Sequence, residues 1–110
     1  MGLKSTVLKQ VGKHISGKIK RQSMQAIVHQ DRTLKYLIGR AKDTAFGRDH
    51  SFGDITDQRS YTSAVPITDY EGHRKYVDQI LAGKSDILWP GMPKYFARTS
   101  GTTSGVKYIP

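Results

Sequence analysis

The sequence predicts an α+β chain that is mostly helical and ends in a strand, a loop and a second strand. Three observations predict this class. Apolar residues recur every three or four positions within the first 41 residues and again over residues 70–81, which is the spacing of amphipathic helices. Near the end, two short runs rich in aromatic and β-branched residues flank residues 100–105, which are Ser, Thr and Gly only.

The first part of the chain predicts two basic helices. Ser5 or Thr6 is expected to cap the first, in which apolar residues from Leu8 to Ile19 form one face. The second is expected over residues 24–41, with Gly47 just beyond its end. Residues 1–48 hold eleven Lys and Arg against two acids, whereas residues 49–110 hold seven of each, so the whole formal charge of +9 lies in the first part.

The middle of the chain predicts shorter elements. Residues 44–52 are expected to form a polar turn, and a short helix is expected to begin within residues 54–57 and to reach Ser63. Thr68 or Asp69 is the expected N-cap of a helix over residues 70–81, which Gly83 ends. Trp89 is interpreted as a buried packing anchor.

Composition limits the kinds of chemistry that the chain can perform. It has no cysteine, so disulfides, thiolate metal sites and cysteine nucleophiles are excluded. Asp49 and His50 are adjacent, but neighbouring side chains usually diverge, so we interpret them as structural and expect no catalytic residue and no metal ligand in this chain. Only 36% of the residues are hydrophobic, which predicts marginal stability. The lack of a long apolar run or secretory signal leads us to expect a cytoplasmic protein.

The loop between the two expected strands is the candidate site. Gly101 and Gly105 allow positive φ angles and a close approach of the backbone to a ligand, and successive N–H groups and hydroxyls can surround phosphate oxygens. Lys107 adds a positive charge. The candidate phosphate-binding residues are Thr99, Ser100, Gly101, Thr102, Thr103, Ser104, Gly105 and Lys107. Val106 stands where the common nucleotide-binding P-loop requires Lys, and a plain hairpin loop is the alternative interpretation.

The ordered string Ser-Gly-Thr-Thr-Ser-Gly-Val-Lys (100–107) resembles the phosphate-binding motif of the adenylate-forming enzymes, Ser-Gly-Thr-Thr-Gly-x-Pro-Lys. Ser104 and Val106 depart from that motif. This variant is similar to the GH3 branch of acyl acid amido synthetases. Three upstream strings resemble GH3 segments in the same order: Phe-Gly-Arg-Asp-His (46–50), Val-Pro-Ile-Thr-Asp-Tyr-Glu (65–71) and Leu-Trp-Pro-Gly (88–91).

The resemblance implies an ATP-dependent enzyme that forms an acyl-adenylate, usually with Mg²⁺, and then joins the acid to an amine or amino acid. Because GH3 enzymes are several times longer than 110 residues, we expect an N-terminal fragment that is inactive alone. Residues 1–48 would be a basic helical segment. Residues 49–110 would begin the α/β N-terminal domain of the adenylate-forming fold and end in the phosphate-binding loop.

The basic helices leave alternative interpretations open. They can be a solvated face packed on the rest of an enzyme, or they can attract an anionic membrane or nucleic acid. No aromatic residue precedes Tyr36, so stacking platforms for single strands are absent from the most basic part, and no specific nucleic-acid partner is expected. The alternative function is therefore a small, non-catalytic binding protein for anionic membrane or nucleic acid.

Overall fold

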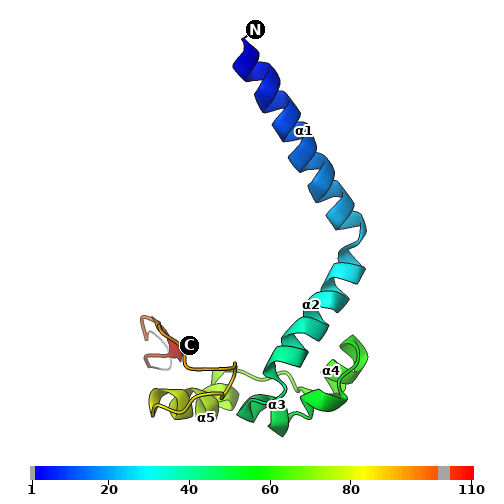
Figure 1. Cartoon of the computed structure of the whole chain (residues 1–110). Coiled ribbons are helices and arrows are strands. Elements are labelled where there is room, and N and C mark those ends of the chain that lie inside the picture. Colours follow the sequence, from blue (N-terminus) through cyan, green and yellow to red (C-terminus); the bar gives the residue numbers. More distant parts are fainter. Residues whose placement is uncertain (1, 102–104) are drawn as a thin grey trace. The chain divides into compact units, whose positions relative to one another are not determined.

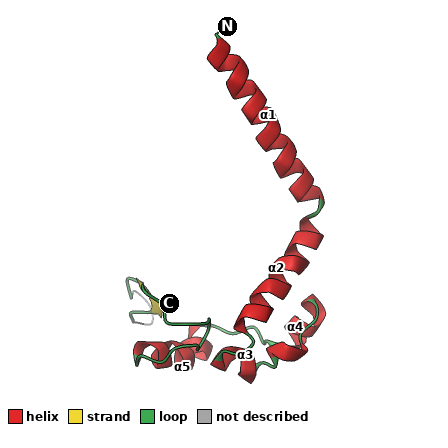
Figure 2. Cartoon of the chain, in the orientation of Figure 1, coloured by secondary structure: helices red, strands yellow, loops and turns green. Residues whose placement is uncertain are grey.

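The computed structural model describes residues 2–101 and 105–110 (Figure 1). Helices dominate these residues, and the two strands pair in an antiparallel hairpin, as the sequence predicts (Figure 2). The elements in chain order are α1 (Leu3–Met24), α2 (Ala26–Ala41), α3 (Ala45–Asp49), the 3-10 helix η1 (Phe52–Asp54), α4 (Gln58–Ala64), α5 (Tyr70–Leu81), β1 (Ala97–Arg98) and β2 (Tyr108–Ile109). Among the described helices, none has the length and apolar character needed to cross a membrane.

The contacts divide the chain into two units, residues 1–33 and 34–110. The division after residue 48, expected from charge, stays a prediction about domain organisation.

In the first unit, α1 begins at Leu3 after Gly2 rather than after Ser5 or Thr6, so that expectation was wrong. The extended backbone of Gly2 precedes the helix, and its carbonyl oxygen accepts from the Ser5 N–H at 2.9 Å. The first turn therefore forms from Leu3 and Lys4, both good helix formers, without a side-chain cap.

The second unit has two hydrophobic clusters. The first contains the end of α2, where Ile38 and Ala41 are buried together with Phe52 of η1. The second joins α5 to the segment after it, because Tyr76 and Ile80 pack against Ile87. The stripe predicted for α5 therefore faces the second cluster through Tyr76 and Ile80. The stripe predicted for α2 faces the first cluster only near the end of the helix, because Ile27, Val28 and Leu37 are exposed.

The segment expected to be a polar turn contains a short helix, so that expectation was wrong. Thr44 caps α3: its hydroxyl accepts from the Gly47 N–H at 3.0 Å and donates to the Ala41 carbonyl oxygen at 2.6 Å. Gly47 does not follow the end of α2 but lies buried inside α3. A Cβ there would collide with the carbonyl oxygen of Ala41, so only glycine lets α3 lie this close to the end of α2.

The helix α5 follows the prediction closely. The Asp69 carboxylate accepts from the Gly72 N–H at 3.2 Å and caps the helix, and Gly83 lies just past its end with a φ of 92°. Trp89, interpreted as a buried anchor, is 42% exposed, whereas Ile87 is 6% exposed. The reason is that Ile87 packs into the second cluster, which leaves Trp89 in the turn beyond it.

The short helix α4 begins after Asp57, the last residue of the expected start. Asp57 is its N-cap, and Ser60 completes a capping box in which each side chain bonds the backbone N–H of the other residue. Asp54, the first residue of that expected start, belongs to η1 instead. The reason is that Asp57 together with Ser60 satisfies more of the free N–H groups at a helix start than Asp54 alone can.

Asp49 and His50 are adjacent in the chain but bond different partners. The Tyr76 hydroxyl donates to the Asp49 carboxylate at 2.7 Å, which links α3 to α5. The His50 Nδ1 lies 2.8 Å from the carbonyl oxygen of Phe46. Burial, together with the bond to the negatively charged Asp49, raises the pKa of Tyr76 from 10.0 to about 12.

This pKa shift predicts how stability depends on pH. Because Tyr76 holds its proton more tightly in the folded state, its contribution is fully present below about pH 10 and is lost as the pH rises towards 12. We expect the urea midpoint of the chain to fall over this range, and to fall less steeply in Tyr76→Phe, which has no phenolic proton. Equal slopes for both proteins would contradict the assignment.

Candidate phosphate-binding site

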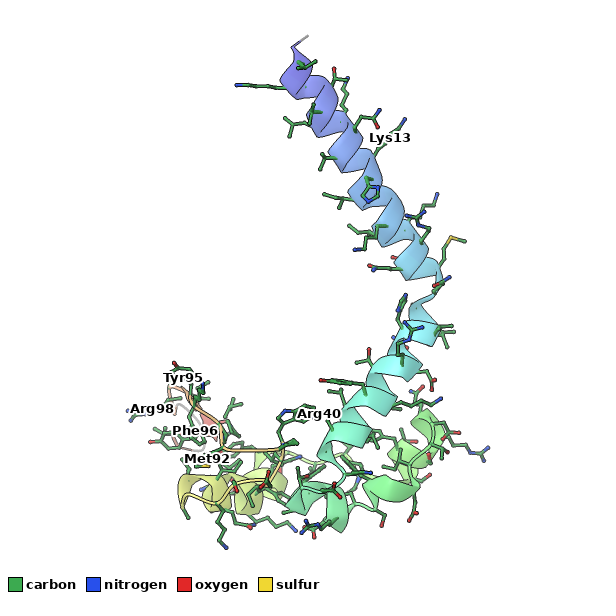
Figure 3. All side chains as sticks on the ribbon, viewed as in Figure 1. Lys13, Arg40, Met92, Tyr95, Phe96 and Arg98 are labelled. Carbon is green, nitrogen blue, oxygen red and sulfur yellow. The ribbon has the colours of Figure 1, made fainter. Side chains whose placement is uncertain are left out.

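The candidate site is the loop that joins β1 and β2. Ala97 pairs with Ile109 and Arg98 with Tyr108, so the two strands run antiparallel on either side of the loop. Figure 3 labels Tyr95, Phe96 and Arg98 along the segment that leads into it. The predicted strand, loop and strand is confirmed, although each strand is only two residues long.

Thr99 closes the base of the loop. Its N–H donates to the Lys107 carbonyl oxygen at 2.9 Å, and its Oγ1 accepts from the Lys107 N–H at 3.0 Å. The Thr99 hydroxyl can still donate its own proton, while its oxygen accepts one bond within the hairpin. The residue therefore holds the two arms of the loop together.

The two glycines have the backbone conformation that the sequence predicts. Gly101 has a φ of 76° and Gly105 a φ of 82°, both in the left-handed region. Their surroundings differ. A Cβ on Gly101 would lie 3.1 Å from the Gly105 carbonyl carbon and from the Val106 nitrogen, whereas a Cβ on Gly105 would meet no atom of the described residues within 4 Å. The loop thus brings its two glycines against each other.

Lys107 is half-buried at the exit of the loop. Its Nζ lies 5.5 Å from the centre of the Tyr70 ring, within the range of a cation–π contact. Tyr70 is the first residue of α5, and the apolar spacing over residues 70–81 predicts for it only a place on an apolar helix face. The feature of the sequence that could have indicated a role for Tyr70 is its hydroxyl, because the hydroxyl of a buried tyrosine usually has a hydrogen-bond partner.

The structure therefore brings together Thr99, Gly101, Gly105 and Lys107, with Ser100 exposed between the first two. The predicted residues Thr102, Thr103 and Ser104 lie outside the described residues. Within the described residues, the arrangement offers backbone N–H groups, a hydroxyl donor and one cation near a tight turn. This is the chemistry of anion binding, and the assignment of these residues to phosphate stays a prediction.

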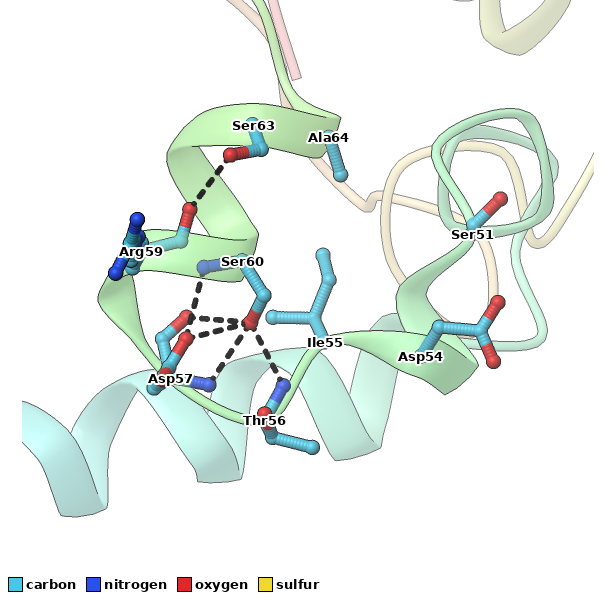
Figure 4. A pocket seen from close by; sticks show the side chains of 9 residues that line it. All are labelled: Ser51, Asp54, Ile55, Thr56, Asp57, Arg59, Ser60, Ser63 and Ala64. Carbon is cyan, nitrogen blue, oxygen red and sulfur yellow. Dashed lines mark hydrogen bonds between the residues drawn. The ribbon is translucent and has the colours of Figure 1, made fainter.

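Another hollow, with a volume of about 530 Å³, lies beside α4 (Figure 4). At the start of α4 its polar groups bond one another, because the Ser60 hydroxyl accepts from the N–H groups of Thr56 and Asp57. The Asp57 carboxylate in turn accepts from the Ser60 N–H at 2.8 Å and from the Ser60 hydroxyl at 2.7 Å, and these two bonds lower the pKa of Asp57. The hollow therefore lies at the capped start of α4.

No group of three or more His, Cys, Asp or Glu that could hold a metal ion occurs in residues 2–101 and 105–110.

The chain belongs to the GH3 family, because the GH3 family N-terminal domain matches residues 15–110. A curated relative is the indole-3-acetic acid-amido synthetase GH3.15 of Arabidopsis thaliana, which is 32% identical over 83 residues. The match covers 74% of this chain and 14% of the relative, so the chain spans a small part of that protein's length. No solved structure matches the chain.

The contrast between the two glycines is testable in the 110-residue chain. Gly101→Ala and Gly105→Ala each force alanine into the left-handed region, at about 1 kcal/mol. Gly101→Ala should cost more, because its Cβ meets the backbone of the other arm. We expect hydrogen exchange at the Thr99 amide to speed up most in Gly101→Ala and to stay unchanged in the helix control Gly39→Ala. A larger effect from Gly105→Ala would show that the loop packs differently.

Proposed function

We propose that the chain supplies the ATP phosphate-binding loop of an acyl acid amido synthetase that works through an acyl-adenylate. The observation that carries this proposal is the hairpin in which Gly101 and Gly105 face each other and Lys107 follows. The loop of this hairpin contains residues 100–107, the string that resembles the phosphate-binding motif of adenylate-forming enzymes. Membership of the GH3 family and the amido synthetase activity in the relative's name support the same assignment. The proposal places residues 49–110 in the N-terminal domain of the adenylate-forming fold and the enzyme in the cytoplasm.

The reaction has two steps. A carboxylate oxygen attacks the α-phosphorus of ATP, the bond to the bridging oxygen breaks, and pyrophosphate leaves. An amine, typically of an amino acid, then attacks the carbonyl carbon of the acyl-adenylate, AMP leaves and the amine loses a proton. Negative charge builds on the pyrophosphate during the first step only. Donors aimed at that charge therefore lower the first barrier.

The residues of this chain would serve that first step. Backbone N–H groups between Ser100 and Gly105 would bind the β- and γ-phosphate oxygens, and Lys107 would offset the charge on the leaving pyrophosphate. The described residues have no cluster of carboxylates or imidazoles suited to Mg²⁺, so no step here is assigned to that metal. The acid, the amine and the adenine would be bound by the rest of the whole protein.

One observation favours the alternative function. The helix α1 has six Lys and Arg, no acid and no buried residue, and several apolar side chains along it are exposed. Such a helix can bind anionic membrane surfaces. The alternative predicts that the chain binds vesicles containing phosphatidylserine, that binding falls steeply with added salt, and that neutral vesicles are not bound. If the chain does not bind the anionic vesicles, the membrane-binding alternative is wrong and the synthetase proposal remains.

The proposed function is tested by separating the two half-reactions in the whole protein. Lys107→Ala should slow carboxylate-dependent exchange of labelled pyrophosphate into ATP by a factor of about 10² to 10³. Transfer of a chemically prepared acyl-adenylate to the amine should keep a near normal rate, because no pyrophosphate leaves in that step. Lys84→Ala, which removes an exposed lysine after α5, is the control.

The pattern of the two rates decides between interpretations. If Lys107→Ala slows both half-reactions equally, the loop supports the fold rather than the phosphate chemistry. If it slows neither, the segment is a plain hairpin and the proposed function of the loop is wrong.

A further inference from the structure

The geometry points to Tyr70 as a positioning residue for the phosphate-binding loop, an inference that rests on the function proposed above. Tyr70 opens α5 directly after the N-cap Asp69, and it lies 38 positions before Tyr108 in the chain. Nothing in the local sequence links the two residues. In the fold, the start of α5 and the second strand of the hairpin lie side by side (Figure 1).

The Tyr70 hydroxyl bonds both backbone polar groups of Tyr108. It donates to the carbonyl oxygen at 3.0 Å and accepts from the N–H at 3.1 Å. One side-chain oxygen thus satisfies the two backbone groups that a neighbouring strand would otherwise bond. Because both groups are half-buried, leaving either one without a partner would be costly.

The pairing of the hairpin explains why Tyr108 needs this partner. Residues on an antiparallel strand alternate between facing the partner strand and facing away from it. Thr99 and Lys107 exchange their bonds across the hairpin, so the backbone groups of the next residue, Tyr108, face away from β1. They point to the open edge, and the Tyr70 hydroxyl is the group that meets them there.

The Tyr70 ring also sets the position of the lysine at the loop exit. Lys107 Nζ lies 5.5 Å from the ring centre, and Arg74 Cζ lies 5.6 Å from it. Arg74 is itself held, since its guanidinium bonds the Glu71 carboxylate at 2.7 Å. The ring therefore restricts where the lysine ammonium can lie relative to the loop.

These contacts fix one arm of the loop to a helix. Strands of two residues give little stability of their own, so the hairpin depends on its neighbours for a defined position. The hydroxyl of Tyr70 holds the backbone after Lys107, and its ring holds the Lys107 side chain. Tyr70 thus acts on phosphate through Lys107 and the loop and makes no contact with the reacting atoms.

The test uses the whole protein and two variants that separate the hydroxyl from the ring. Tyr70→Phe keeps the ring and removes both hydrogen bonds, and Tyr70→Leu removes the ring as well. We expect pyrophosphate exchange to slow about tenfold in Tyr70→Phe and about a hundredfold in Tyr70→Leu, because small displacements of a positioned group have effects of this size. Aminolysis of prepared acyl-adenylate should be unchanged in both. Tyr36→Phe, which removes the hydroxyl of a tyrosine that is 61% exposed, should change neither rate.

Combining variants distinguishes a positioning role from a structural one. In a Lys107→Ala background, the further loss from Phe to Leu at position 70 should disappear, because the ring then has no lysine to hold. If Tyr70→Phe lowers only the melting temperature, or slows both half-reactions equally, Tyr70 is structural and the inference is wrong. If Lys107→Ala has no effect on pyrophosphate exchange, the proposed function fails instead. If Lys107→Ala slows the exchange and Tyr70→Phe does not, only the positioning role is overturned.

Discussion

The packing of Phe46 is the constraint on which the rest of the second unit depends. Its ring contacts both hydrophobic clusters and lies 5.7 Å from the ring of Phe52 and 5.0 Å from that of Tyr76, centre to centre. Its N–H donates to the Ile87 carbonyl oxygen at 2.9 Å. One residue of α3 thus joins η1, α5 and the segment after α5. Without it, the two small clusters would have no common contact of this size.

The position of the candidate phosphate-binding loop depends on the packing of Phe46. Phe46 and Asp49 hold α5 through Tyr76, and α5 holds the hairpin through Tyr70. The hairpin alone is too short to be stable, so its geometry is supplied by the helix beside it. A functional loop carried on a fixed helix is a common arrangement, because binding residues need a rigid support and loops cannot provide one themselves. The order of dependence therefore runs from the aromatic contacts to α5, and from α5 to the loop.

Local signals predicted α5 and the hairpin, because a cap at Asp69, an apolar stripe and a Ser/Thr/Gly loop are each complete within a few residues. The short helix α3 was missed because burial of Gly47 against the end of α2 is a tertiary contact that a Gly-Arg-Asp-His string does not reveal. At the site, Thr99, Gly101, Gly105 and Lys107 were predicted from one motif. Tyr70 was not, because its bonds to Tyr108 span 38 residues and depend on how the two elements dock.

We propose that this loop, held by α5, binds the phosphates of ATP. The most direct measurement is a crystal structure of the whole protein with a non-hydrolysable ATP analogue. We expect β- and γ-phosphate oxygens within hydrogen-bonding distance of backbone N–H groups between Ser100 and Gly105, with both bonds from the Tyr70 hydroxyl to Tyr108 intact. An analogue bound in full at another site, with the loop making no phosphate contact, would contradict it.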